Sequence, residues 1–247
     1  MSGRAQSRPH HNVLDCARTD NKKLLVSKLI KMTIAEIHQQ LKRYQKSEKK
    51  IFVTSSFQTH SIPLLHVLSN SGVPIDVLFI NTGFHFPETV AFKDKVKKLL
   101  DLNVIDVRSQ VPKSLQKDEE GHFYFASDSD YCCFLNKTQP LEPYLMQYDV
   151  WITGVRSDQS SDRKKMKTEQ DAPFNTLRFH PLLDWSPKQI YEYRILHNLP
   201  EHPLDKKGYQ SIGCAPCTRK FDINDERSAR WFGQNKTECG LHKDLIK

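Results

Sequence analysis

Apolar side chains recur with a helical period near the start of the chain. They lie three or four residues apart, at Ile34, Ile37, Leu41 and Tyr44. Thr33 followed by Glu36 is a capping-box sequence, in which a hydroxyl and a carboxylate satisfy backbone N–H groups at a helix start. The pattern predicts an amphipathic helix that begins directly after Thr33.

Short apolar runs alternate with helical patterns further along. Buried strands are predicted over residues 51–53, 75–80, 103–107 and 150–154, and helices over 60–68, from near Pro87 and from Ser186, where Pro187 and Gln189 fit the first turn. This alternation indicates an α/β fold, a mostly parallel twisted sheet with helices on both faces. Ligands of such sheets bind beyond the carboxyl ends of the strands.

The chain divides into three parts by composition. Residues 1–30 form a polar N-terminal arm, residues 31–230 an α/β domain, and residues 231–247 a C-terminal segment that we expect to be mobile. Residues 158–171 are polar enough to predict a mobile loop.

Composition limits the class of partner. No apolar run approaches the roughly 20 residues that cross a bilayer, so no membrane association is expected. The formal charge is +8, but lysines and arginines alternate with acids, which favours a small anion over nucleic acid. Six cysteines without a secretory signal indicate a reducing compartment, the cytoplasm.

The loop over residues 55–61 follows the first predicted strand. It has neither of the glycine-rich phosphate-binding patterns. Its hydroxyls and backbone amides at a helix start could still hold an anion, and an ordinary capped loop is the alternative.

Four cysteines are candidates for binding a metal group. Cys132 and Cys133 are adjacent, and Cys214 and Cys217 form a Cys-x-x-Cys pair. Four thiolates can hold zinc or an iron-sulfur cluster. Adjacent cysteines cannot easily both reach one small ion, so the pattern favours a 4Fe-4S cluster. The alternative is a redox-active Cys-x-x-Cys pair beside a buried Cys-Cys.

Two further residues stand close to these thiols or resemble a nucleophile. Lys137 follows Cys133 by four residues, so on a helix its ammonium would share the face of that thiol, although a solvated lysine has the same spacing. Cys239 has His242 three residues on, which could favour the thiolate that attacks. On spacing alone a lone cysteine near a histidine is more often incidental, and Cys16 receives no role.

Taken together, these motifs resemble the assimilatory adenylyl-sulfate reductases, relatives of the phosphoadenylyl-sulfate reductases. The resemblance runs from about Lys50 to His242. It is carried by Cys132-Cys133, Asn81-Thr82-Gly83 with Pro87-Glu88-Thr89, Gly154-Val155-Arg156-Ser157-Asp158-Gln159-Ser160, Gly213-Cys214-Ala215-Pro216-Cys217-Thr218-Arg219 and Glu238-Cys239-Gly240-Leu241-His242.

The resemblance implies a fold, a reaction and partners. The fold is like that of the adenine-nucleotide alpha hydrolases, and residues 31–230 would bind nucleotide and cluster. The Cys239 thiolate would attack the sulfur of adenosine 5'-phosphosulfate, expel AMP and become an S-sulfonate. A thiol of thioredoxin or glutaredoxin would then release sulfite. A 4Fe-4S cluster on the four cysteines would act structurally and electrostatically.

The resemblance also assigns residues to the substrate. Guanidinium groups bind planar sets of oxygens bidentately, which suits a phosphosulfate. The positions that match the family's substrate contacts are Ser55, Ser56 and Phe57 of the nucleotide loop, the cluster-adjacent Lys137, Arg156, Arg163, Arg227, Arg230 and His242.

Two positions depart from the family pattern. The loop over residues 55–61 lacks the family's glycine, and Ser157 stands where many members carry a second arginine. Only five residues follow His242, so we expect an external reductant. The rival readings are the same chemistry on 3'-phosphoadenosine 5'-phosphosulfate, an ATP-dependent adenylating enzyme of the same fold and a zinc-binding nucleic-acid module. The sequence leaves open whether the protein forms a homo-oligomer.

Overall fold

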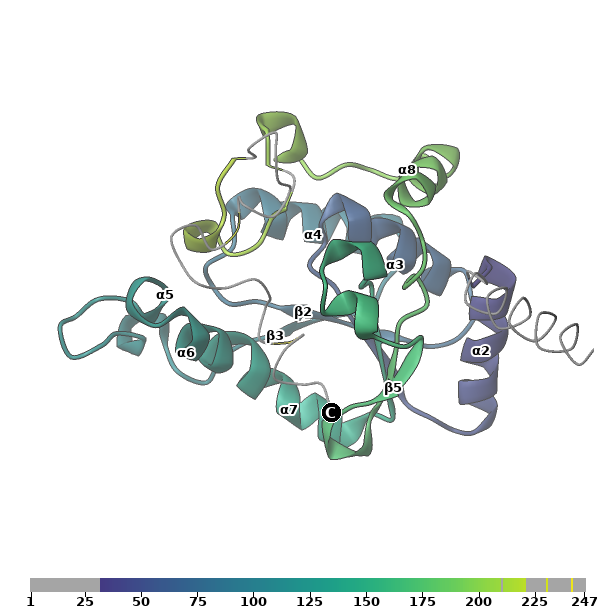
Figure 1. Cartoon of the computed structure of the whole chain (residues 1–247), viewed down its shortest axis with the longest axis horizontal. Helices are drawn as coiled ribbons and strands as arrows, with labels where there is room; N and C mark the ends of the chain where they lie inside the picture. Colours follow the sequence, from purple (N-terminus) through teal and green to yellow (C-terminus); the bar gives the residue numbers. More distant parts are fainter. Residues whose placement is uncertain (1–31, 210, 221–229, 231–240, 242–247) are drawn as a thin grey trace, which may run out of the picture. The chain divides into compact units, whose positions relative to one another are not determined.

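A six-stranded sheet forms the centre of the domain, in a computed structural model that describes residues 32–209, 211–220, 230 and 241 (Figure 1). Its strand order is β3-β2-β1-β4-β6-β5. The strands are β1 (Ile51–Thr54), β2 (Asp76–Ile80), β3 (Val104–Val107), β4 (Val150–Thr153), β5 (Glu169–Asp171) and β6 (Leu177–Phe179). All neighbours pair in parallel except β5, which runs antiparallel at the edge. The predicted mostly parallel sheet is confirmed.

Helices cover both faces of this sheet. On one face lie α2 (Ile34–Lys46), α3 (Ile62–Ser69), α4 (Pro87–Leu99) and α8 (Pro187–Leu196). The other face carries α7 (Gln139–Gln147), preceded by α5 (Tyr124–Ser127), α6 (Ser129–Cys133) and the π-helical segment η3 (Phe134–Thr138). The 3-10 turns are η1 (Thr59–Ser61), η2 (Lys113–Leu115), η4 (Ser157–Gln159), η5 (Arg163–Lys165), η6 (Pro173–Asn175), η7 (Asp205–Lys207) and η8 (Ala215–Cys217).

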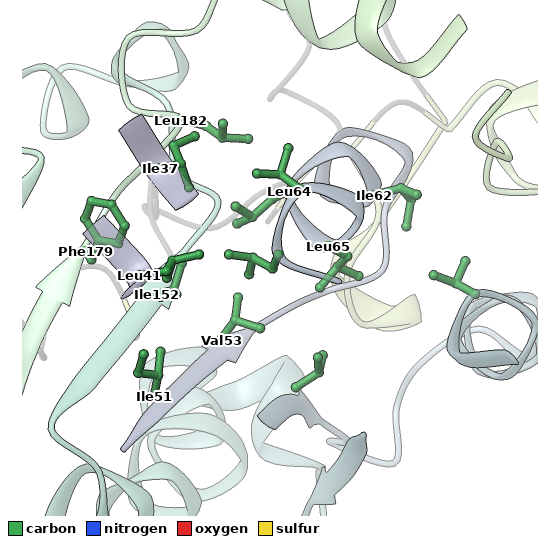
Figure 2. Close-up of a cluster of buried hydrophobic side chains, with 14 of the residues drawn as sticks. Ile37, Leu41, Ile51, Val53, Ile62, Leu64, Leu65, Ile152, Phe179 and Leu182 are labelled. Carbon is green, nitrogen blue, oxygen red and sulfur yellow. The ribbon is translucent and has the colours of Figure 1, made fainter. Parts of the chain in front are cut away.

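The period of two along β1 sends its side chains into separate cores on the two faces. Val53 packs with residues of α2 and α3 in the larger cluster that Figure 2 shows, where Ile37 and Leu41 of α2 face the sheet. Phe52 points the other way and stacks on Trp151 in a cluster closed by α7. Both faces are buried, as expected for a parallel sheet.

Both predicted capping boxes are present. Glu36 N–H donates to Thr33 Oγ1 at 3.3 Å, and Thr33 N–H donates back to the Glu36 carboxylate at 2.7 Å. Ser186 and Gln189 make the same reciprocal pair at the start of α8. The helix starts are therefore set by local sequence, as predicted.

The polar stretch over residues 158–171 differs from the expected mobile loop. It contains two 3-10 turns, and its end forms the edge strand β5. The described residues from Met32 onward belong to one compact unit. None of the helices in this described part combines the length and apolar character that a bilayer-crossing helix needs.

Candidate active site

A cavity of about 480 Å³ lies where β1 and β4 end. The chain winds outward from β1 through β2 to β3, and β4 starts the other half of the sheet, so this is the topological switch point where α/β sheets bind ligands. The lining comes from the ends of β1, β2 and β4, from the loops that follow them, and from Lys137, residues 211–214, Arg230 and Leu241.

The lining combines apolar and hydroxyl groups from the first half of the sheet. Val53, Leu64 and Phe79 supply apolar surface, and Ser55 and Ser56 supply hydroxyls. Ser55 Oγ accepts the N–H of Phe57 at 3.1 Å, which holds the loop in a tight turn.

Phe57 does not line this cavity, although the sequence placed it in the nucleotide loop's contact set. Its ring is fully buried against Phe79, with centroids 5.7 Å apart. Its φ of 52° lies in the left-handed region that usually favours glycine. The side chain therefore belongs to the core, and only its backbone shapes the loop.

Among the described residues, four cationic side chains line the cavity: Lys137, Arg156, Arg163 and Arg230. Each was a predicted substrate contact, and the fold brings them together from three separate stretches of the chain. Arg156 is 3% exposed and makes a bidentate pair with Asp158, at 2.9 and 3.1 Å. Arg163 is 8% exposed and donates to the side-chain oxygen of Gln159. Both guanidinium groups are thus held in fixed positions before any ligand arrives.

Arg230 connects the cavity to the Cys-x-x-Cys turn. Its Nε donates to the Cys217 carbonyl at 3.3 Å, and its backbone bridges to Thr218. A Cβ on Gly213 would lie only 2.5 Å from the Arg230 guanidinium carbon. The glycine therefore leaves the room in which the guanidinium lies.

The four predicted metal ligands line a second, smaller cavity: Cys132, Cys133, Cys214 and Cys217. They come from α6 and from the η8 turn, and none of these four forms a disulfide. The turn is anchored to the loop after β2, because Ala215 N–H donates to the Phe84 carbonyl at 2.7 Å. The Thr82 hydroxyl lies 3.2 Å from Cys214 Sγ.

Burial and neighbouring charges both act on the thiols of this second cavity. Burial, with Cys214 close by, raises the pKa of the Cys132 thiol to about 11, while Lys137 lowers it. Lys137 Nζ donates to Cys133 Sγ at 3.5 Å, so the predicted lysine-thiol contact is present. Within the described residues no three His, Cys, Asp or Glu side chains are gathered tightly enough for a single metal ion. Thiols are the soft ligands that zinc and iron-sulfur groups take.

The two cavities share part of their walls. Thr82, Lys137 and Cys214 line both of them. A ligand in the larger cavity would thus lie beside the cavity of the four thiols.

Several predicted site residues lie outside the described residues. These are Cys239, His242 and Arg227, together with the unassigned Cys16. Leu241, two residues after Cys239, is described: it lines the larger cavity and packs against the core cluster around Phe52.

Comparison with known proteins decides the family. The family model described as "Phosphoadenosine phosphosulfate reductase domain" matches residues 50–220 of this chain. The chain belongs to this reductase family. The expected resemblance to adenylyl-sulfate reductases and their relatives is confirmed.

Curated relatives of this reductase family member carry a more specific name. The adenosine 5'-phosphosulfate reductase of Rhodococcus erythropolis is 39% identical over 181 residues, 72% of this chain and 73% of the relative. Those of Streptomyces coelicolor and Bacillus cereus are 38% and 35% identical, over 77% and 81% of this chain and 80% and 86% of the relatives.

Solved structures confirm the expected fold. Phosphoadenylyl-sulfate reductase of Candida auris, in a phosphate complex, has a TM-score of 0.59 at 21% identity and covers 83% of this chain and 97% of its own. FMN adenylyltransferase of Candida glabrata has a TM-score of 0.52 at 15% identity, over 76% and 68%. The chain thus shares the fold of these two structures.

Sequence reasoning missed several residues of the reductase site. His85 lines the larger cavity, with Nε2 2.9 Å from the Ile80 carbonyl. Burial lowers the pKa of His85, as do Lys137 and Arg230, so its ring is neutral and Nε2 donates. Asp158 and Gly213 were quoted only as parts of motifs. Gly213 has no local signal, because Arg230 meets it only in the fold, whereas Asp158 lies only two residues after its partner Arg156.

Proposed function

We propose that this reductase family member converts adenosine 5'-phosphosulfate to sulfite and AMP in sulfate assimilation. The observation that carries the proposal is the shared wall of Thr82, Lys137 and Cys214 between a cation-lined cavity and a four-thiol cavity. The names of the curated relatives support the same substrate.

The charges and shape of the larger cavity suit this substrate. Its four cations can meet the oxygens of a phosphosulfate, and its apolar lining suits an adenosine. Asp158 already neutralises part of the Arg156 charge. That pairing orients the guanidinium and limits the excess positive charge that the ligand has to balance.

The reaction assigns the attack to the Cys239 thiolate. Its sulfur forms a bond to the sulfo sulfur, the bond from that sulfur to the phosphate oxygen breaks, and AMP leaves with the bonding electrons. Arg230 and Lys137 would stabilise the charge that develops on the departing phosphate. An external dithiol then attacks the S-sulfonate, sulfite leaves with the electron pair, and the dithiol is oxidised to a disulfide.

The position of Leu241 supports this assignment. It lines the larger cavity, and two extended residues span at most about 7 Å. The proposed attack requires Cys239 to reach this cavity, and the short spacing to Leu241 is compatible with that requirement.

We infer further that the four cysteines hold a 4Fe-4S cluster. When bound, such a group would supply structural and electrostatic support beside the substrate. Lys137, which contacts Cys133 and lines both cavities, would be the residue that couples the two sites. Thioredoxin or glutaredoxin as reductant and a cytoplasmic location complete the proposal.

Trapping the covalent intermediate tests the nucleophile. Wild-type protein mixed with adenosine 5'-phosphosulfate and no dithiol is expected to gain one sulfo group, located on Cys239 by peptide mass mapping. Cys239→Ser is expected to gain none while still binding the nucleotide, and Cys16→Ser is the matched control that keeps the adduct. Absence of an adduct on wild-type protein would contradict the mechanism.

Two further measurements test substrate and cofactor. The ratio of kcat/KM for the nucleotide with and without a 3'-phosphate separates the proposed substrate from its rival. Protein purified anaerobically is expected to contain about four irons per chain. One zinc per chain and no visible absorption would instead support the rival hypothesis of a zinc-binding nucleic-acid module.

A further inference from the structure

The helix that carries the tandem cysteines changes its winding directly after them. Helix α6 ends at Cys133, the π-helical segment η3 occupies Phe134–Thr138, and α7 continues from Gln139. The Gln139 N–H donates to the Phe134 carbonyl five residues back. A wider turn of this kind needs a cause, because it is uncommon and often lies at functional sites.

A side chain donates into the helix where the winding widens. Asn136 Nδ2 donates to the Cys132 carbonyl at 2.9 Å. In an α-helix this carbonyl accepts the backbone N–H of residue 136, so the side chain of the same residue competes for the same acceptor. Bonding of a side chain to the carbonyl four residues back often bends a helix.

Asn136 is held by a second buried amide. Gln116 Nε2 donates to Asn136 Oδ1 at 3.0 Å, and Asn136 Nδ2 donates back to Gln116 Oε1 at 2.6 Å. Gln116 also donates to the Val111 carbonyl at 2.9 Å. Both side chains are 2% exposed.

The hydrogen bonds leave only one orientation for the pair. Each amide has two N–H groups, and all four are used: two of Gln116 on Val111 and Asn136, two of Asn136 on Gln116 and Cys132. Turning the Asn136 amide over would set its oxygen against the Cys132 carbonyl. Cys132 Sγ lies 3.7 Å from the same Nδ2, so the amide also faces the thiol.

The amide pair therefore connects the end of η2 with η3 and, through the Cys132 carbonyl, with α6. Gln116 follows η2, Asn136 lies in η3, and Asn136 also lines the cavity of the four cysteines. We propose that Gln116 and Asn136 are the positioning pair of the tandem cysteines: they hold the π turn that aims Cys132 and Cys133 into one cavity with Cys214 and Cys217. Only the identity of the group bound there rests on the proposed function.

The positioning role predicts effects on the thiols themselves. Asn136→Ala removes both hydrogen bonds between Asn136 and Gln116 and the side-chain donor to the Cys132 carbonyl, in a site that water does not reach. Loss of an outer residue that orients metal ligands typically costs 10- to 100-fold in metal affinity. The tandem cysteines should also open more often, by about tenfold or more, because three buried hydrogen bonds are lost.

The experiment compares full-length variants in two states. In the first state, iron per chain is measured after anaerobic purification. In the second state, iron is removed by a chelator, and the rate of iodoacetamide alkylation of each cysteine is measured by peptide mass mapping. Asn136→Ala is compared with Asn70→Ala, because Asn70 also donates to a carbonyl four residues back, the His66 carbonyl at 2.8 Å, but far from the thiols in an exposed position.

The expected result is a selective change at the tandem cysteines. In Asn136→Ala the alkylation rates of Cys132 and Cys133 rise about tenfold or more relative to Cys217, and bound iron at limiting supply falls, while Asn70→Ala matches wild type. Gln116→Glu keeps the shape and the acceptor but loses both donors and sets carboxylate oxygens against the Val111 carbonyl and Asn136 Oδ1, so it should show the same change.

Two results would overturn the positioning role. One is a wild-type alkylation pattern in Asn136→Ala, and the other is an equal rise at all four cysteines. If Asn136→Ala has no cooperative thermal transition, Gln116→Glu decides by the same criteria. A wild-type protein without iron refutes the proposed cofactor, and the alkylation rates still decide the role of the pair.

Discussion

Gly213→Ala is expected to impair the enzyme through Arg230 alone. The backbone of Gly213 is not in the left-handed region, so alanine meets no conformational penalty there. Its Cβ would lie 2.5 Å from the guanidinium carbon and 2.8 Å from one terminal nitrogen, whereas ordinary contact begins at 3.4 Å. Arg230 must therefore withdraw by about 1 Å, a displacement that for a binding group costs roughly 10²-fold in rate.

A double-mutant cycle checks this reasoning. The value of kcat/KM for sulfite formation is measured for wild type, Gly213→Ala, Arg230→Ala and the double variant. Arg230→Ala removes the group that the new methyl displaces, so Gly213→Ala should have little further effect in that background. Activity of Gly213→Ala within twofold of wild type, or a full additional loss in the double variant, would refute the steric argument. Unchanged thermal midpoints would exclude a general loss of folding.

Two further predictions concern stability. Burial lowers the pKa of the fully buried His202 to about 4, so the native state disfavours its proton. The stability that depends on neutral His202 is complete above pH ~6.5 and falls by about 3 kcal/mol as pH drops to ~4, and His202→Gln should flatten this part of a urea-unfolding series. Leu41→Ala should lower the unfolding free energy by about 2–5 kcal/mol, because Leu41 is fully buried, whereas Leu196→Ala, at a side chain 75% exposed, should change it little in the same assay.

The parts of the fold that could be predicted are those whose signals are local. The capping boxes at Thr33 and Ser186 contain both partners within four residues, and the apolar runs of β1, β2 and β4 are long enough to stand out. The strands β5 and β6 have no such signal. Each has three residues, β5 is entirely polar, and β6 has the fully buried Arg178 at its centre.

Arg178 shows why burial there could not be predicted. Its guanidinium lies 4.3 Å from the centre of the Trp151 ring. An arginine in a strand normally indicates an exposed face, yet stacking on an aromatic ring allows it to be buried. The ring comes from the neighbouring strand β4, which the sequence pattern does not pair with β6.

The charged residues of the candidate site could be predicted from the sequence. Residues whose role depends on how side chains pack in the fold could not. Lys137, Arg156, Arg163 and Arg230 were expected contacts, and the fold gathers them around one cavity. Gly213 was not expected to matter for Arg230. Its importance arises from a side chain 17 positions later that needs the space where a Cβ would be.

The loop after β1 shows how the core can hold a non-glycine residue in a left-handed turn. Phe57 adopts a φ of 52°, a conformation that costs a non-glycine residue roughly 1–2 kcal/mol. Its ring is fully buried against Phe79, and burying a phenylalanine contributes about 1.5–3 kcal/mol. The burial offsets the backbone cost, and the same ring anchors the loop to β2. A glycine at position 57 would give the loop its turn without the anchor, so the phenylalanine strengthens the loop's attachment to the sheet.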